Sequence, residues 1–140
     1  MRNISSDLLK AYLQARYIIM FDQQEYCMRV GQRHMWLDRI MSHHNYHNGI
    51  FITAYNPGSQ LQSEQMNQQN QQRLISQLAA DDMSYFCGYS TDDEGLWPVE
   101  QSLLVFNLTD DSANLYAQSY RQNAYLKIII NQPVKLVLVD

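Results

Sequence analysis

The sequence predicts a single α+β domain built on a mixed, mostly antiparallel sheet. Apolar segments of strand length recur along the chain, amphipathic helical segments separate them, and the first and last pairs of strand segments have hairpin spacing. A chain of 140 residues is long enough to bury one stable core. We therefore expect one domain over residues 1–140, with the element order α-β-β-α-β-α-β-β-α-β-β.

The first third of the chain predicts a helix, a hairpin and a second helix. Residues 5–7 offer serine and aspartate caps for a short helix with an apolar stripe. Residues 17–21 and 26–30 are apolar and aromatic, so we expect a hairpin with residues 22–25 as its loop. The spacing of apolar residues then predicts a helix from residue 32 or 33 to about residue 44.

The chain is organised around the stretch that follows residue 49. Residues 50–54 form an unbroken apolar run, which is typical of a strand covered on both faces. Asn56-Pro57-Gly58 ends this strand, because proline removes a ladder donor and glycine tolerates a turn. Ser63 is a suitable N-cap for a long helix over residues 64–80.

This long helix has an apolar face that becomes polar towards its amino end. Leu74 and Leu78 mark the apolar part, and the same face carries Asn67, Asn70 and Gln71 in the preceding turns. We expect these amides near the corner that follows the preceding strand. There they either satisfy the backbone of the loop or contact a ligand.

The remainder of the chain predicts three elements and a terminal hairpin. A strand over residues 83–89 follows the long helix, so a right-handed parallel crossover is the favoured connection. Residues 102–108 form another continuous apolar strand, followed by a helix capped by an aspartate at residue 110 or 111. Residues 124–130 and 134–139 have the pattern of two hairpin strands.

Composition and charge exclude several classes of function. The net charge of -4 and the pI near 5.4 argue against nucleic-acid binding, which normally requires clustered Lys and Arg. No apolar segment approaches the roughly 20 residues of a membrane span, and the amino terminus lacks the pattern of a signal peptide. Cys27 and Cys87 stand alone in strand-like segments, which indicates reduced, buried thiols in a cytoplasmic protein.

Four motifs together resemble a known family. They are Thr53-Ala54-Tyr55-Asn56-Pro57, Ser63-Glu64 followed by Asn67, Trp97-Pro98-Val99-Glu100-Gln101-Ser102-Leu103-Leu104-Val105, and Gln122-Asn123-Ala124. Over residues 15–139 the chain resembles a small bacterial family known only as a domain of unknown function. That family more often has tryptophan at the position of Tyr55 and glycine at the position of Arg121. The resemblance implies a bacterial protein and supports the domain boundaries, and it implies no activity, substrate or cofactor.

One composite candidate site gathers polar and aromatic residues from the ends of the predicted strands and helices. Together they supply hydrogen-bond donors, acceptors, one carboxylate and two aromatic rings, the groups that orient a ligand in a pocket. The alternative explanation is a structural hydrogen-bond network that fixes the ends of the sheet. The candidate residues are Thr53, Tyr55, Asn56, Asn67, Trp97, Glu100, Gln122 and Asn123.

Three classes of function follow from this site and this fold. The favoured one is a binding or regulatory module that holds a small molecule or peptide in the amide-rich corner. The second is a hydrolase or transferase, since burial of Glu100 would raise its pKa and suit it to general acid–base catalysis. The third is a protein-interaction domain that uses an edge strand of a terminal hairpin.

No cofactor or metal site is predicted. His43 and His47 have the spacing of two ligands on one helix face, but the helix is expected to end first, and no acidic or cysteine partner is adjacent. The acidic segment at residues 92–95 lacks the alternating oxygen ligands of a calcium-binding loop. We expect it to be a solvated turn.

Overall fold

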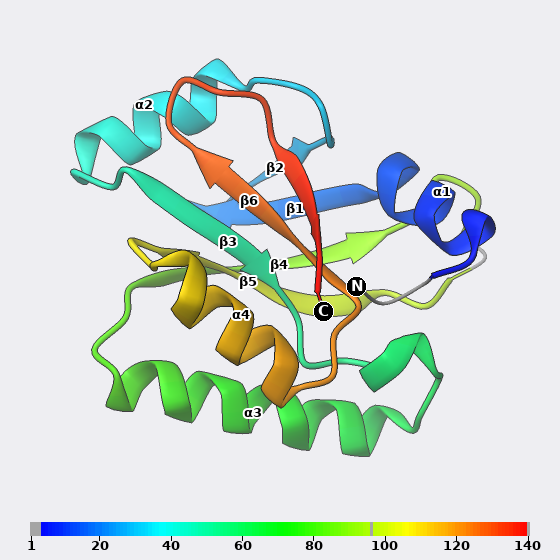
Figure 1. Cartoon of the computed structure of the whole chain (residues 1–140). Helices are drawn as coiled ribbons and strands as arrows, with labels where there is room; N and C mark the ends of the chain where they lie inside the picture. The colour runs from blue at the N-terminus through cyan, green and yellow to red at the C-terminus, as the bar shows by residue number, and fades with distance from the viewer. Residues whose placement is uncertain (1–3, 96, 140) are drawn as a thin grey trace.

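A computed structural model describes residues 4–95 and 97–139 of the chain. Over these residues the predicted α+β class and element order are confirmed (Figure 1). The elements are α1 (Ser6–Gln14), β1 (Arg16–Phe21), β2 (Gln24–Met28), α2 (Met35–His43), β3 (Asn48–Ile52), the 3₁₀ turn η1 (Pro57–Ser59), α3 (Glu64–Ala80), β4 (Tyr85–Thr91), β5 (Glu100–Phe106), α4 (Asp110–Ser119), β6 (Ala124–Ile129) and β7 (Lys135–Leu138).

Side-chain caps fix where the helices begin. Ser5 and Ser63 each accept a hydrogen bond from a backbone N–H in the first turn of α1 and α3, as the sequence predicts. In α4 the N-cap is Thr109, so the predicted aspartate cap is wrong. Asp110 and Asp111 lie instead in the first helical turn, where negative charge is favourable next to the helix dipole.

The first hairpin turns over two residues. Asp22 and Gln23 have φ angles of 50° and 63°, the left-handed conformation that a type I′ turn requires. Phe21 pairs directly with Gln24, so the predicted loop over residues 22–25 is too long by the two residues that join β2. The turn matches the twist of the flanking strands, which explains why the strands pair up to its edge.

The sheet has the strand order β2-β1-β4-β5-β3-β6-β7, and each pairing is antiparallel. β3 and β4 run in the same direction, but β5 lies between them and pairs with both. The connection through α3 therefore joins two strands of the same direction, as predicted for a parallel crossover, but these strands are not neighbours in the sheet. From Ser102 to Phe106 every residue of β5 is buried, and a strand apolar on both faces belongs in the middle of a sheet.

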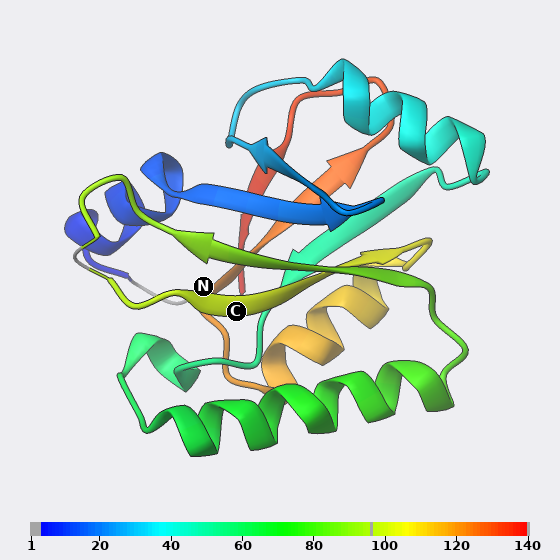
Figure 2. The ribbon, with the colours of Figure 1, turned by 180° about the vertical axis from the view of Figure 1, so that it is seen from behind.

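Helices cover both faces of the sheet (Figures 1 and 2). α3 and α4 lie on one face, where Leu74 and Leu78 pack with Ile50 and Ile52. α2 lies on the other face, where Met41 belongs to the second core cluster. Alternate residues of β3 and β5 therefore enter two different cores, as expected for strands in the middle layer of the fold.

The sheet curls so that its two edges approach each other. Gly31, just after β2, donates its N–H to the carbonyl of Val134 at 2.8 Å, and the N–H of Val134 donates to the carbonyl of Gln32 at 3.0 Å. Val134 lies just before β7, so these bonds join the two ends of the strand order. The face under α2 is therefore concave, and α1 lies at the other end of this face (Figure 1).

Two further observations concern the chain as a whole. In the part of the chain that the structure describes, no helix combines the length and the apolar character needed to cross a membrane. Cys27 is half-buried and Cys87 is exposed, both as free thiols, so the prediction of burial is wrong for Cys87. Cys87 pairs with Leu103 of β5 but lies one strand further from the centre of the sheet, beyond the cover of α3 and α4.

Candidate functional site

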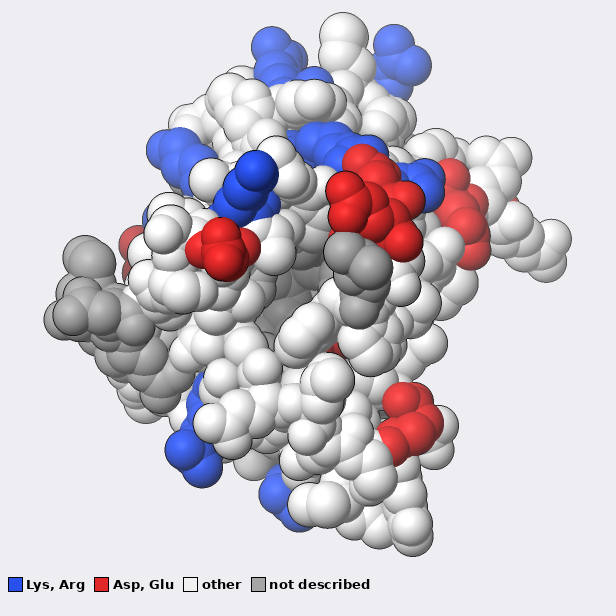
Figure 3. Space-filling model, turned by 90° about the vertical axis from the view of Figure 1, so that its right-hand side faces the viewer, with Lys and Arg blue, Asp and Glu red and all other residues white. Residues whose placement is uncertain are grey.

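A cavity of about 310 Å³ opens between α1 and the concave face of the sheet. Leu8 and Ala11 of α1 form one wall, and Tyr17, Phe51 and Leu126 of the sheet form the other. The surface on this side of the molecule is hollowed (Figure 3). Cavities at the mouth of a curled sheet with mostly apolar walls are common positions for small-molecule sites.

The floor of the cavity carries a carboxylate. The Asn56 side-chain amide donates a hydrogen bond to Glu100 Oε2 at 2.8 Å, and the Trp97 side chain donates a second one. Burial raises the pKa of Glu100 above its ordinary value, and the hydrogen bonds from Asn56 and Trp97 oppose this shift. Glu100, the first residue of β5, is thus a carboxyl group shielded from bulk water and contacted by the turn at Asn56 and the loop at Trp97.

Asn56 is held in place by a reciprocal pair of hydrogen bonds with Asn67. The N–H of Asn56 donates to Asn67 Oδ1 at 2.8 Å, and Asn67 Nδ2 donates back to Asn56 Oδ1 at 2.9 Å. Asn56 has φ of 47°, a left-handed conformation that asparagine tolerates better than most residues. Gln62 adds a backbone hydrogen bond to the same Asn56 oxygen at 3.1 Å. The amino end of α3 therefore fixes the side chain that contacts Glu100.

The other amides of this corner also bind the backbone. Gln71 Oε1 accepts from the N–H of Ala54 at 2.9 Å, while Gln71 Nε2 has no hydrogen-bond partner among the described residues. Gln122 Nε2 donates to the carbonyl of Tyr55 at 3.0 Å. These bonds join α3 and the segment before β6 to the turn after β3, which makes the turn rigid.

The structure divides the eight candidate residues into two groups. One group lines the cavity: Thr53, Asn56, Trp97, Glu100 and Gln122. The other group supports it from behind, and consists of Tyr55, Asn67 and Asn123, whose side chains bind Glu64 at 2.7 Å, Asn56 at 2.9 Å and Ser59 at 2.9 Å respectively. The pocket and the structural network that the sequence offered as alternatives are thus adjacent, and they share Asn56.

A model of the DUF3293 family, described as proteins of unknown function, matches residues 52–125, just over half of the chain. The chain belongs to this family. The resemblance to a domain of unknown function is thereby confirmed over these residues. No curated protein and no solved structure matches the chain. The DUF3293 match includes all eight candidate residues, whereas α1 and β1, which form much of the apolar wall, lie outside it.

No sequence pattern indicates that the apolar residues of the cavity line a site. In this DUF3293 protein, Tyr17, Phe51 and Leu126 have the pattern of ordinary core residues. α1 carries an apolar stripe that is visible in the sequence, and the structure buries none of its residues. Its Tyr12 hydroxyl lies 2.8 Å from Ser59 Oγ, and the Tyr17 hydroxyl donates to the Tyr12 carbonyl at 2.5 Å. α1 is therefore attached to the rim by polar contacts and covers the cavity with its apolar stripe.

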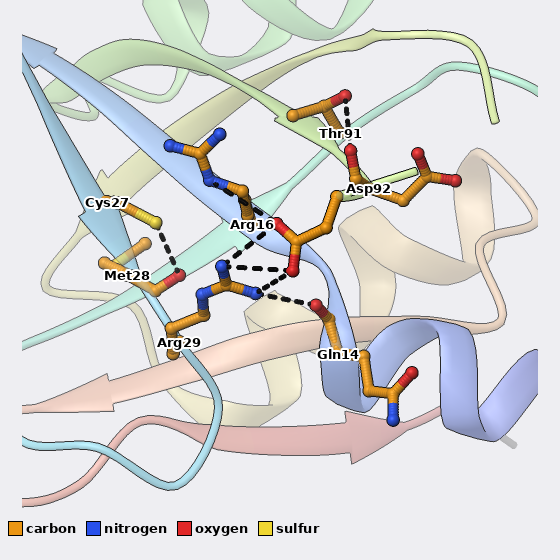
Figure 4. A network of polar contacts seen from close by, with 8 residues as sticks. Gln14, Arg16, Cys27, Met28, Arg29, Thr91 and Asp92 are labelled. Carbon is orange, nitrogen blue, oxygen red and sulfur yellow. Dashed lines mark hydrogen bonds and ion pairs between the residues drawn. The ribbon is translucent and has the colours of Figure 1, made fainter. Parts of the chain in front are cut away.

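An arginine links the end of α1 to the loop that follows β4 (Figure 4). Arg29 donates to the carbonyl of Gln14 at 2.8 Å and forms an ion pair of 3.1 Å with Asp93. Arg16 lies 3.9 Å from the same carboxylate. Exposed ion pairs stabilise a protein by at most about 1 kcal/mol, so these contacts add little to the stability of the fold and link α1 to the loop after β4.

The histidines fall outside the cavity. His43 is the last residue of α2, His44 is its C-cap and His47 lies beyond the helix, so His43 and His47 do not share a helical face. Among the described residues no group of three or more His, Cys, Asp or Glu side chains is arranged to hold a metal ion.

Proposed function

We propose that this DUF3293 protein is a cytoplasmic bacterial module that binds a small molecule in the cavity under α1. The observation that carries the proposal is the Glu100 carboxylate at the floor of a mostly apolar cavity. Ligand pockets typically measure about 300–1,000 Å³ and combine apolar walls with a few fixed polar groups. The volume of about 310 Å³ is at the small end of this range, which favours a compact molecule over a peptide.

The rigid support behind the cavity also favours binding. Asn56 and Glu100 belong to a turn and a strand that the amides of α3 hold in place. A preorganised polar group loses little conformational entropy when a ligand binds. α1 has the opposite character, since it has no buried residue and few polar attachments. It is the element best suited to move aside when a ligand enters.

The proposal is tested by filling the cavity from the side of α1. Ala11→Trp places a large ring in the wall of the cavity, while Lys10→Trp places the same ring on an exposed position of the same helix. Benzyl alcohol and benzylamine serve as compact aromatic probes, and amide chemical shifts measure binding. We expect shifts around Phe51 and Leu126 in the wild type and in Lys10→Trp, and none in Ala11→Trp. Shifts elsewhere, or shifts that persist in Ala11→Trp, would contradict the proposal.

A hydrolase or transferase is a second candidate function, and the raised pKa of Glu100 favours it. A carboxyl group whose pKa is moved towards neutrality by burial is suited to general acid–base catalysis. The test is turnover of chromogenic esters, phosphates and glycosides by the wild type and by Glu100→Gln. Catalysis by Glu100 predicts turnover that Glu100→Gln abolishes, whereas equal turnover by the two proteins would exclude that role.

The edge-strand interaction receives less support. The residues that follow β2 and precede β7 already hydrogen-bond to each other through Gly31, Gln32 and Val134. The backbone groups next to the end of β2 and the start of β7 are therefore already hydrogen-bonded. A docking strand would find fewer free backbone groups along these two edge strands.

A further inference from the structure

The charged groups that line the cavity are all of one sign. Asp92 and Glu100 contribute carboxylates, and none of the described lining residues is a lysine, an arginine or a histidine. The nearby arginines Arg16 and Arg29 form ion pairs with Asp93 (Figure 4), so the Asp93 carboxylate balances part of their positive charge. A cavity with acidic groups and low-dielectric walls attracts cations and repels anions.

Glu100 retains acceptor capacity that the described residues do not use. A carboxylate accepts about four hydrogen bonds, and within residues 4–95 and 97–139 two side chains donate to Glu100, those of Asn56 and Trp97. A buried carboxylate without a counter-charge is costly, and a bound cation that donates hydrogen bonds to it reduces that cost. The raised pKa of Glu100 agrees with a carboxylate that lacks such a partner.

Aromatic residues line the same cavity as this carboxylate. Tyr17 and Phe51 pack edge to face with ring centres 5.7 Å apart, and Trp97 closes the cavity on the side of Glu100. The faces of aromatic rings attract ammonium groups, and their bodies accommodate apolar groups. The same walls therefore suit both ends of a molecule with a cationic head and an apolar body.

We propose that the ligand is a compact primary amine, whose ammonium group pairs with Glu100 and whose apolar body lies between α1 and the sheet. This inference rests on the proposed binding function and specifies the chemical class of its ligand. Asn56 and Trp97 orient the carboxylate, and Leu8, Ala11 and Leu126 contact the body of the ligand.

The test compares three probes of one shape: benzylamine, benzyl alcohol and benzoate, titrated into the full chain and followed by amide chemical shifts. We expect benzylamine to bind about tenfold or more tightly than benzyl alcohol, and benzoate not to bind. Glu100→Gln should lower the affinity for benzylamine by about the same factor, and so remove its advantage over benzyl alcohol. Equal affinity for the three probes, or a benzylamine affinity that Glu100→Gln does not change, would overturn the proposal.

A pH series on the wild type gives an independent measurement. Protonation of Glu100 removes the partner of the ammonium group, so benzylamine affinity should fall as the pH falls through the raised pKa of Glu100. The titratable groups around Glu100 are Tyr17, Tyr55 and Asp92. Burial raises the pKa of both tyrosines, so they stay neutral. Asp92→Asn removes the other carboxylate and so distinguishes its contribution from that of Glu100. A pH dependence that Asp92→Asn abolishes would assign the cation to Asp92 and overturn the role of Glu100.

The two proposals fail in different ways. If Ala11→Trp does not block any of the probes, the cavity is not their binding site and the proposed function fails. If Ala11→Trp blocks all of them but benzylamine has no advantage over benzyl alcohol, the cavity is a binding site and only the amine proposal fails.

Discussion

The side-chain amide of Asn56 donates a 2.8 Å hydrogen bond to Glu100, which links the left-handed turn after β3 to the first residue of β5. The same Asn56 side chain accepts from Asn67, so one amide joins a helix, a turn and a carboxylate. Because Asn56 is almost fully buried, with 3% of its surface exposed, changes at this position act on both the fold and the cavity.

Asn56→Asp should destabilise the protein at neutral pH by about 2–4 kcal/mol, since it replaces a donor to Glu100 by a second buried negative charge. Urea unfolding measures this free energy. Asn45→Asp is the matched control, because Asn45 also has a left-handed φ, of 59°, but is exposed. Equal effects of the two substitutions would show that the contact with Glu100 does not matter. The cost of Asn56→Asp should shrink at acidic pH, where the two carboxyl groups share protons.

Glu100→Gln should change the pH dependence of stability. Burial raises the folded-state pKa of Glu100 above its unfolded value, so the folded protein binds the proton more tightly. The stability that Glu100 contributes is therefore present at low pH and is lost as the pH rises through its folded-state pKa. The free energy of unfolding of Glu100→Gln minus that of the wild type should increase from about pH 4 upwards. Each tenfold stronger binding of the proton in the folded state corresponds to roughly 1.4 kcal/mol. A difference in unfolding free energy that stays constant with pH would contradict the raised pKa of Glu100.

Arg121→Gly should stabilise the protein by a few tenths to about 1 kcal/mol. Arg121 has φ of 53°, a conformation that costs a residue with a Cβ about 1–2 kcal/mol and costs glycine almost nothing. The greater freedom of glycine in the unfolded chain offsets part of this gain. Arg73→Gly makes the same chemical change in the exposed middle of α3 and should instead destabilise by about 1 kcal/mol. Thermal unfolding of both variants distinguishes the two effects by their sign.

Gly88→Ala should destabilise the sheet by about 3 kcal/mol or more. A Cβ at Gly88 would lie 2.2 Å from the carbonyl oxygen of Ile18 and 3.1 Å from Phe51, so β1 and β4 would have to separate. Cys87→Ala, at the exposed neighbouring position, should change stability by less than about 0.5 kcal/mol. Chemical denaturation measures both, and a mild effect of Gly88→Ala would mean that the strands can adjust.

The elements of the fold were largely predictable from local sequence. Ser63 caps a helix that ends where predicted, and the two-residue turn at Asp22-Gln23 was missed because neither residue is the glycine that usually marks it. Arg121, where the resembling family more often has glycine, has a left-handed φ, and the sequence analysis did not predict this conformation. Asn56 contacts both Asn67 and Glu100 at one end of the sheet. The end of β3 and the start of β5 are neighbours there because the two strands are antiparallel.

By itself the sequence determined the α+β class, the order of the elements, the caps of α1 and α3 and the polar corner, because hydrophobic period, turn residues and capping residues act over a few positions of the chain. Only the tertiary structure decided that β5 enters between β3 and β4 and that the sheet edges meet at Val134. It also decided that Tyr17, Phe51 and Leu126 border an open space rather than fill a core. Pairing between distant strands and the fit of α1 over them depend on contacts between segments far apart in the chain, and no local pattern encodes such contacts.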